Sequence, residues 1–213
     1  MSNMRDLWYD WLGMNTWLFK QINSLSDISM YASLMKLVTI FGDKKFLPVI
    51  IVAIAIFSLA STIARYVTKK GGNKNYIFMW FNIFILLGSG FLAGNYIIDY
   101  TKKHSYYPRP YIALQGEVRQ LEAQPADEAY HSFPSGHAII ITILVFALWP
   151  AMSENFRWAG VFLIFFVAWS RVALGVHYPM DVISGFVLAI IQMSIIRYIL
   201  FSIIRSIRGI LKV

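Results

Sequence analysis

The stretch FLPVIIVAIAIFSLASTIA, residues 46–64, contains no charged side chain and is almost wholly apolar. A helix needs about 20 mostly apolar residues to cross the hydrocarbon core of a bilayer. Residues 76–98 and 182–201 are long apolar runs of the same kind, and residues 135–151 and 158–174 are shorter ones. The sequence therefore predicts an all-α, polytopic membrane helical bundle with five spans.

The composition of the whole chain agrees with a membrane protein. Of its 213 residues, 58% are hydrophobic and 14% are charged, and the mean hydropathy is +0.57, which is too apolar for an ordinary soluble domain. The net charge is +8, but the basic residues stand at the ends of apolar runs. This placement favours anionic lipid headgroups as counter-charges and argues against a nucleic-acid partner. With no cysteine, the chain has no disulfide, thiolate metal site or thiol nucleophile.

The connections between the spans predict the topology, because cytoplasmic loops carry the excess of Lys and Arg. Two segments are rich in these residues, the first connection and the C-terminal tail: Arg65, Lys69, Lys70 and Lys74, then Arg197, Arg205, Arg208 and Lys212. The long loop of residues 99–133 instead has four Lys or Arg against five Asp or Glu. We expect this loop to face outward. Residues 117–128 are expected to form a solvated cover over the site, and a role in substrate recognition is the alternative.

Residues 1–45 differ from the remainder of the chain. They mix Trp, Leu and Phe with Asp and Lys, a pattern typical of helices that lie in the membrane interface. We therefore divide the chain into an interfacial segment, residues 1–45, and a membrane-embedded core, residues 46–213. A sixth span within the first segment is the alternative, and it would move the N-terminus to the cytoplasm. The first 20 residues do not have the pattern of a cleaved signal peptide.

A histidine and an aspartate form the first polar motif. Pro179 is suited to a first helical turn, so the four-residue step from His177 to Asp181 places both side chains near the start of a helix. A carboxylate beside an imidazole fixes its tautomer and leaves the other ring nitrogen free to attack. His177 is thus the candidate nucleophile, although such a pair alone is also typical of a helix cap beside an interfacial histidine.

The second motif, Pro134-Ser135-Gly136-His137, leads directly into an apolar run. Ser135 is a favourable N-cap residue, Gly136 permits close approach of a ligand to the backbone, and the N-terminus of a helix binds anions. His137 in the first turn is placed to act as a general acid. The segment predicts a phosphate-binding helix start, although the tetrapeptide by itself is more often only a helix start.

Three cations complete the pattern: Lys102, Arg109 and Arg171. A phosphoryl group carries its charge on several oxygens, so fixed cations stabilise it in the transition state. Arginine also engages two oxygens at once. Individually, each of these residues is also typical of a membrane-interface anchor. By the parity of five spans, all three motifs meet at the outward face.

Together the motifs Lys-x6-Arg-Pro, Pro-Ser-Gly-His and Ser-Arg-x5-His-x3-Asp, between Lys102 and Asp181, resemble those of the type 2 phosphatidic acid phosphatase (PAP2) superfamily. Its members include bacterial lipid phosphatases, glucose-6-phosphatase and vanadium haloperoxidases. The resemblance implies a helical bundle in which His177 forms a phosphohistidine, Asp181 orients it and His137 protonates the leaving group. It implies that the remaining motif residues hold the phosphate: Lys102, Arg109, Ser135, Gly136 and Arg171. No cofactor or metal is expected.

The resemblance implies a lipid phosphatase of a bacterial inner membrane with its site toward the periplasm or exterior. Its substrate would be a phosphorylated membrane lipid: undecaprenyl pyrophosphate, phosphatidylglycerol phosphate, phosphatidic acid or lipid A. A lipid phosphotransferase would use the same residues and is the alternative. A protein that only binds lipid headgroups would need the cations but neither a nucleophile nor an acid, and a haloperoxidase would be expected in a soluble chain.

Overall fold

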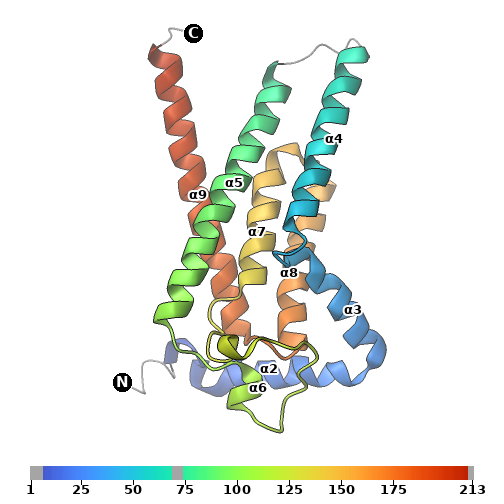
Figure 1. The fold of residues 1–213 in the computed structure, drawn as a ribbon, viewed down its shortest axis with the longest axis vertical. Coiled ribbons are helices and arrows are strands. Elements are labelled where there is room, and N and C mark those ends of the chain that lie inside the picture. Colours follow the sequence, from blue (N-terminus) through green and yellow to red (C-terminus); the bar gives the residue numbers. More distant parts are fainter. Residues whose placement is uncertain (1–6, 69–73, 211–213) are drawn as a thin grey trace.

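The structure is a computed structural model that describes residues 7–68 and 74–210 (Figure 1). These residues form helices and loops, and one isolated β-bridge, between Tyr107 and His131, is the only strand-like pairing within them. The prediction of an all-α helical bundle is therefore confirmed.

Five apolar helices correspond to the five predicted spans: α4 (Leu47–Val67), α5 (Lys74–His104), α7 (Gly136–Leu148), α8 (Glu154–Ala173) and α9 (Pro179–Ile210). The helix α5 is longer than its apolar run and continues through residues 99–104, which the sequence assigned to the outward loop. Hydropathy detects only the apolar part of a helix, whereas its backbone hydrogen bonds continue into a polar last turn. Lys102 consequently lies on this last turn of α5.

Four of these helices are long and apolar enough to cross a membrane, namely α4, α5, α8 and α9. Helix α7 has 13 residues, or about 20 Å at 1.5 Å per residue, against about 30 Å for a hydrocarbon core. The 3₁₀ turn η5 (Trp149–Ala151) follows it directly. A count of five or six spans therefore remains a prediction.

Helix α7 forms the centre of the bundle. It packs against α5, α8 and α9, and all of its side chains from Ala138 to Val145 are buried. Helix α4 lies at the outside, packed against α5, and buries only Leu47 and Ser58. Its remaining apolar surface is exposed over most of its length, as expected for a helix that contacts lipid.

The N-terminal segment forms short helices that begin at one end of the bundle (Figure 1). In order they are η1 (Trp11–Gly13), α2 (Met14–Ser24), η2 (Leu25–Asp27), α3 (Ser29–Thr39) and η3 (Ile40–Gly42). Of these, α3 packs against α8, and η3 packs against α7. Helix α2 crosses this end of the bundle in Figure 1 and contacts α8 and α9. An interfacial position for this segment, and its separation from the core at residue 45, remain predictions.

The long loop covers the same end of the bundle. It contains the short helices α6 (Pro110–Ala113) and η4 (Ala126–Glu128), and Figure 1 places α6 at the same end as α2, opposite the C-terminal ends of α4 and α9. The basic residues predicted to be cytoplasmic that the structure places, such as Arg65 and Arg205, belong to the opposite end. Lys69, Lys70 and Lys212 lie outside the described residues.

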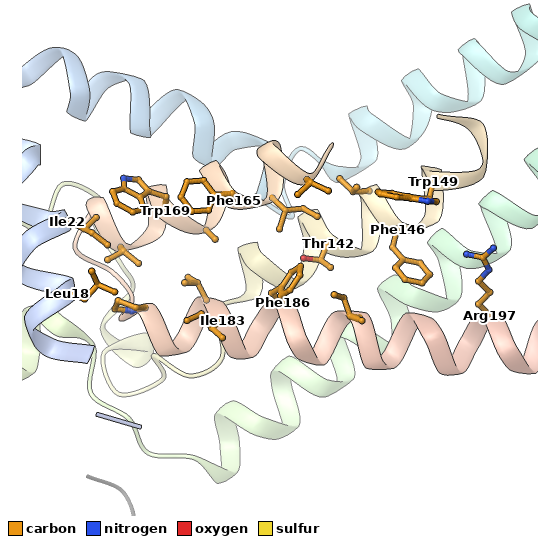
Figure 2. A pocket seen from close by; sticks show the side chains of 18 residues that line it. Leu18, Ile22, Thr142, Phe146, Trp149, Phe165, Trp169, Ile183, Phe186 and Arg197 are labelled. Carbon is orange, nitrogen blue, oxygen red and sulfur yellow. The ribbon is translucent and has the colours of Figure 1, made fainter. Parts of the chain in front are cut away.

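An apolar cavity of about 660 Å³ lies between α7, α8 and α9 (Figure 2). Leu18 and Ile22 of α2 line one end of it, while Trp149 and Arg197 line the other. All but a few of its lining residues are apolar. The cavity therefore suits hydrocarbon far better than a polar ligand.

Candidate active site

Asp181 is held by several hydrogen bonds at the loop-covered end of the bundle. It lies in the first turn of α9 and is fully buried. Its Oδ2 accepts hydrogen bonds from the Tyr178 amide at 2.8 Å and the Ser132 hydroxyl at 2.5 Å, and its Oδ1 accepts one from the Tyr9 hydroxyl at 2.7 Å. Three donors from separate segments therefore fix one carboxylate in place, as a buried charge requires.

His177 lies between this carboxylate and an arginine. Its Nδ1 is 3.4 Å from Asp181 Oδ2, and its Nε2 is 3.4 Å from Arg109 Nη1. Since a guanidinium can only donate, Nε2 must carry the lone pair and Nδ1 the hydrogen. The geometry thus leaves the lone pair on Nε2, and this nitrogen faces Arg109.

The ionisation of His177 favours the same state. Burial, followed by the positive charges of Arg109, Arg171 and Lys102, holds the pKa of His177 well below the ordinary value of 6.5. Both causes penalise the imidazolium form. At neutral pH the ring is therefore uncharged and able to attack.

This ionisation can be measured directly. In protein labelled with ¹⁵N-histidine and held in detergent micelles, the His177 ring is expected to remain neutral, with its hydrogen on Nδ1, at pH 6.5. Proton–nitrogen correlation spectra would report this state, and the His177→Ala spectrum would assign the signal. Half-protonation of His177 at or above pH 6.5 would contradict the proposed environment.

Arg109 is buried and held from several directions. Its Nη1 donates to the Val176 carbonyl at 2.9 Å, its Nε donates to the Glu128 carbonyl at 2.9 Å, and its Nη2 pairs with Glu128 Oε2 at 2.9 Å. The Lys102 ammonium contacts the same Oε2 atom at 2.5 Å. One loop carboxylate therefore joins two of the expected phosphate-binding cations.

Arg171, in the last turn of α8, is the most deeply buried of the cations, with a side chain that is 2% exposed. Its Nη1 and Nη2 pair with the two oxygens of Glu122 at 2.6 and 2.9 Å, and Nη1 also donates to Thr39 Oγ1 at 2.8 Å. Its Nε is buried with no hydrogen-bond partner in the described part of the chain. A buried donor of this kind calls for a ligand or water.

Ser135 and Gly136 begin helix α7 beside these groups. Ser135 is the N-cap residue by position, as predicted, but its hydroxyl makes no capping hydrogen bond. That hydroxyl is buried and unpartnered within the described residues, so it can bind a ligand. Gly185 of α9 allows this close packing, because a Cβ there would lie 2.7 Å from the Ser135 carbonyl oxygen.

His137 lies one residue into α7 and is half-buried. Its backbone packs against η3, where a Cβ on Gly42 would lie 3.0 Å from His137 Cβ. Its ring interacts electrostatically with His177, Arg171, Arg109 and Lys102. The structure therefore brings both histidines and all three cations to one place, from four separate stretches of sequence.

The sequence did not identify several residues that shape this site. Tyr9 and Ser132 hold Asp181, Thr39 contacts Arg171, and Glu122 and Glu128 pair with the cations. The interpretation of residues 117–128 as a solvated cover was incomplete, because these two carboxylates reach into the site. Only the surplus of acidic residues in this loop gave any signal of such pairing.

Comparison with known proteins identifies a family whose matched region contains all three motifs. The family model described as the PAP2 superfamily matches residues 78–205, more than half of the chain. The chain belongs to the PAP2 superfamily. Among curated proteins, an undecaprenyl-diphosphatase of Sulfolobus acidocaldarius is 30% identical over 178 residues, which are 83% of this chain and 74% of that protein.

Two solved structures share the fold. The crystal structure of Aquifex aeolicus LpxE aligns with a TM-score of 0.60 at 18% identity, covering 87% of this chain and 95% of that one. A PAP2-type phosphatidylglycerolphosphate phosphatase from Bacillus subtilis aligns with a TM-score of 0.57 at 19% identity, covering 88% and 87%. With its apolar helices, this PAP2 chain is a multi-pass membrane protein of a phosphatase family.

Proposed function

We propose that this PAP2 protein hydrolyses a phosphate or pyrophosphate monoester of a membrane lipid through a phosphohistidine on His177. The placement of His177 carries the proposal: Asp181 holds the Nδ1 side of the ring while Nε2 faces Arg109. A neutral ring in this orientation has the lone pair that attack on phosphorus requires. A protein that only binds headgroups would gain nothing from such an arrangement.

In the first step, Nε2 attacks the terminal phosphorus, and the bond from phosphorus to the leaving-group oxygen breaks. Burial and the neighbouring cations lower the pKa of His137 in the free site. The negative charge of a bound phosphate offsets these cations and favours the imidazolium, which donates a proton to the leaving-group oxygen, so that the lipid leaves as an alcohol or a shorter phosphate. Asp181 stabilises the positive charge that develops on the His177 ring. The products of this step are phosphohistidine and the dephosphorylated lipid.

In the second step, water attacks the phosphorus and His137 accepts its proton. The bond from phosphorus to Nε2 then breaks, releasing inorganic phosphate and the neutral ring. Arg109, Arg171 and Lys102, with Ser135 and the first amides of α7, are placed to stabilise the phosphoryl oxygens in both steps.

The surroundings of the site support a lipid substrate. The apolar cavity lies between α7, α8 and α9, each of which also carries site residues, and we assign it to the hydrocarbon chain of the substrate. Undecaprenyl pyrophosphate is the first candidate, because the relative at 30% identity is an undecaprenyl-diphosphatase. Phosphatidylglycerol phosphate follows, since one structural neighbour acts on it, and then phosphatidic acid and lipid A.

We further propose a position in the inner membrane of a bacterium, with the site toward the periplasm or exterior. The site lies at the end of the bundle opposite the basic ends of α4 and α9. Because cytoplasmic segments carry the excess of Lys and Arg, the site end would face outward.

Phosphate release from a lipid panel tests the function. Wild-type protein in detergent is expected to release phosphate from undecaprenyl pyrophosphate or another of the four lipids, and EDTA is expected to leave the rate unchanged. Among the described residues, no cluster of three His, Asp or Glu side chains could hold a metal ion, so a metal has no evident ligands there.

Three outcomes would contradict the proposal. An EDTA-sensitive rate that returns with added Mg²⁺ would overturn the metal-independent mechanism. Phosphate that appears on an added acceptor lipid and not in solution would favour a phosphotransferase. Failure to release phosphate from all four lipids, while a control phosphatase succeeds, would refute the lipid phosphatase.

A further inference from the structure

Every cation of the candidate site is paired with a carboxylate of the long loop. Glu122 forms a two-pronged pair with Arg171, while the Oε2 atom of Glu128 lies between Arg109 and Lys102. The pairing lowers the pKa of both carboxyl groups. Burial by itself would raise the pKa values of Glu122 and Glu128, but Arg171 in one case, and Lys102 and Arg109 in the other, lower them below the ordinary value.

These carboxylates occupy the same donors that a phosphate would use. Carboxylate and phosphate oxygens both match the planar fork of an arginine. While Glu122 is bound, it takes one hydrogen from each of Nη1 and Nη2 of Arg171, and Thr39 takes the second hydrogen of Nη1. A phosphoryl group can then receive hydrogen bonds only from Nε and the second hydrogen of Nη2. Full use of Arg171 by a substrate therefore requires Glu122 to leave, and full use of Lys102 and Arg109 requires Glu128 to leave.

The loop backbone beside Glu122 is held by contacts that do not involve the Glu122 side chain. The Leu121 amide donates to the Leu174 carbonyl at 3.1 Å. Asn23 bonds both the amide and the carbonyl of Arg119, at 2.9 and 3.0 Å. The side chains of Glu122 and Glu128 are 31% and 32% exposed, so each carboxylate has a path to water.

The charges of the competing groups differ between classes of phosphate. Two carboxylates bring two negative charges to three cations. A terminal phosphate monoester replaces them with two negative charges and three free oxygens, whereas a phosphodiester offers one charge and two free oxygens. When a monoester replaces the two carboxylates, the negative charge beside the three cations stays nearly the same. When a diester replaces them, the cations are left with one negative charge fewer.

We infer that Glu122 and Glu128 are specificity-determining residues that compete with substrate for its cations, so that a dianionic terminal phosphate enters and a monoanionic phosphodiester does not. The inference rests on the proposed function for its biological meaning. In a membrane, phosphodiester headgroups vastly outnumber terminal phosphates. The two carboxylates keep such headgroups from occupying the site.

Equilibrium binding tests this competition without turnover. The probes are methylphosphonate, largely a dianion near pH 8, and its monomethyl ester, a monoanion. Calorimetry on protein in detergent is expected to show methylphosphonate binding to Glu122→Gln on the order of tenfold more tightly than to wild type, because the competing state is lost. The monomethyl ester should bind measurably to Glu122→Gln and to Glu128→Gln, but not to wild type.

Glu117→Gln is the matched control. Glu117 belongs to the same loop, but it pairs with Lys20 of α2 and is exposed, so its amide should leave both affinities within about twofold of wild type. Glu122→Gln preserves the size of the side chain and retains one side-chain oxygen that can accept a hydrogen bond from Arg171. If Glu122→Gln does not fold, Glu128→Gln provides the same test with Arg109 and Lys102.

Unchanged or weaker methylphosphonate binding by both variants would overturn the inference and show that the carboxylates merely position the cations. Binding of the monomethyl ester by wild type would overturn it as well. Because neither measurement requires catalysis, these results are distinct from the lipid panel. A protein that fails to hydrolyse lipid could still show the competition, and an active phosphatase could lack it.

Discussion

His177→Ala is expected to lower the rate of lipid phosphate release by a factor on the order of 10⁴ or more, which is typical of loss of a covalent nucleophile. In the proposed mechanism the imidazole of His177 supplies the attacking atom, and His137, the other histidine of the site, is assigned to proton transfer. Arg109 and Lys102 are cations and have no lone pair for attack. Both carboxylate oxygens of Asp181 already accept hydrogen bonds, three in all. The measurement is phosphate release from the preferred lipid, with wild type measured alongside.

Two further observations identify the reason for such a loss. Rapid acid-free quenching of wild type with ³²P-labelled lipid should trap an acid-labile, base-stable phosphoprotein that is missing from His177→Ala. Methylphosphonate binding by the variant should persist, because the cations and α7 remain. A phosphoprotein of normal yield in His177→Ala would place the covalent bond on another residue and refute the mechanism.

Asp181→Asn is expected to give the second largest effect, a loss of about 10²–10⁴-fold in kcat with a smaller change in KM. The amide has nearly the shape of the carboxylate but lacks the charge that stabilises the cationic ring, and it can present an NH₂ group toward His177 Nδ1, which favours the wrong tautomer. The comparison is kcat and KM for both proteins, with thermal unfolding measured in parallel.

Tyr9→Phe separates this electrostatic role from a structural one. It removes one hydrogen bond to Asp181 Oδ1 and retains the carboxylate, so its loss should stay below about tenfold. Asp181→Asn activity close to that of Tyr9→Phe would show that Asp181 serves mainly to hold the start of α9. If the tautomer shifts, the His177 signal in the proton–nitrogen correlation spectrum should also move in Asp181→Asn.

The apolar runs predicted the helices well because a spanning helix must satisfy its own backbone and expose apolar side chains. The ends of the helices were less accurate. Helix α5 includes residues 99–104 and α9 extends to Ile210, beyond the apolar runs at 76–98 and 182–201. Polar residues in a last turn look like loop in a hydropathy profile, although they continue the same hydrogen-bonded helix.

The groups around Asp181 and the cations could not have been predicted. Tyr9 is one aromatic residue among many in an N-terminal segment assigned to the membrane interface, and it contacts a residue 172 positions away in the sequence. Glu122 and Glu128 are ordinary acidic residues of a polar loop. No periodicity marks them, because irregular segments place side chains by contacts with other parts of the chain and not by a repeating backbone.

The sequence by itself determined the all-α membrane class, the approximate helices and the motif residues that place this chain in the PAP2 superfamily. These features depend on local composition and spacing, which are written directly in the chain. The tertiary structure decided that the loop carboxylates lie on the cations, that Tyr9 and Ser132 hold Asp181, and that Nε2 of His177 faces Arg109. Each of these depends on how segments far apart in sequence pack around α7, and packing of that kind is set by the whole fold.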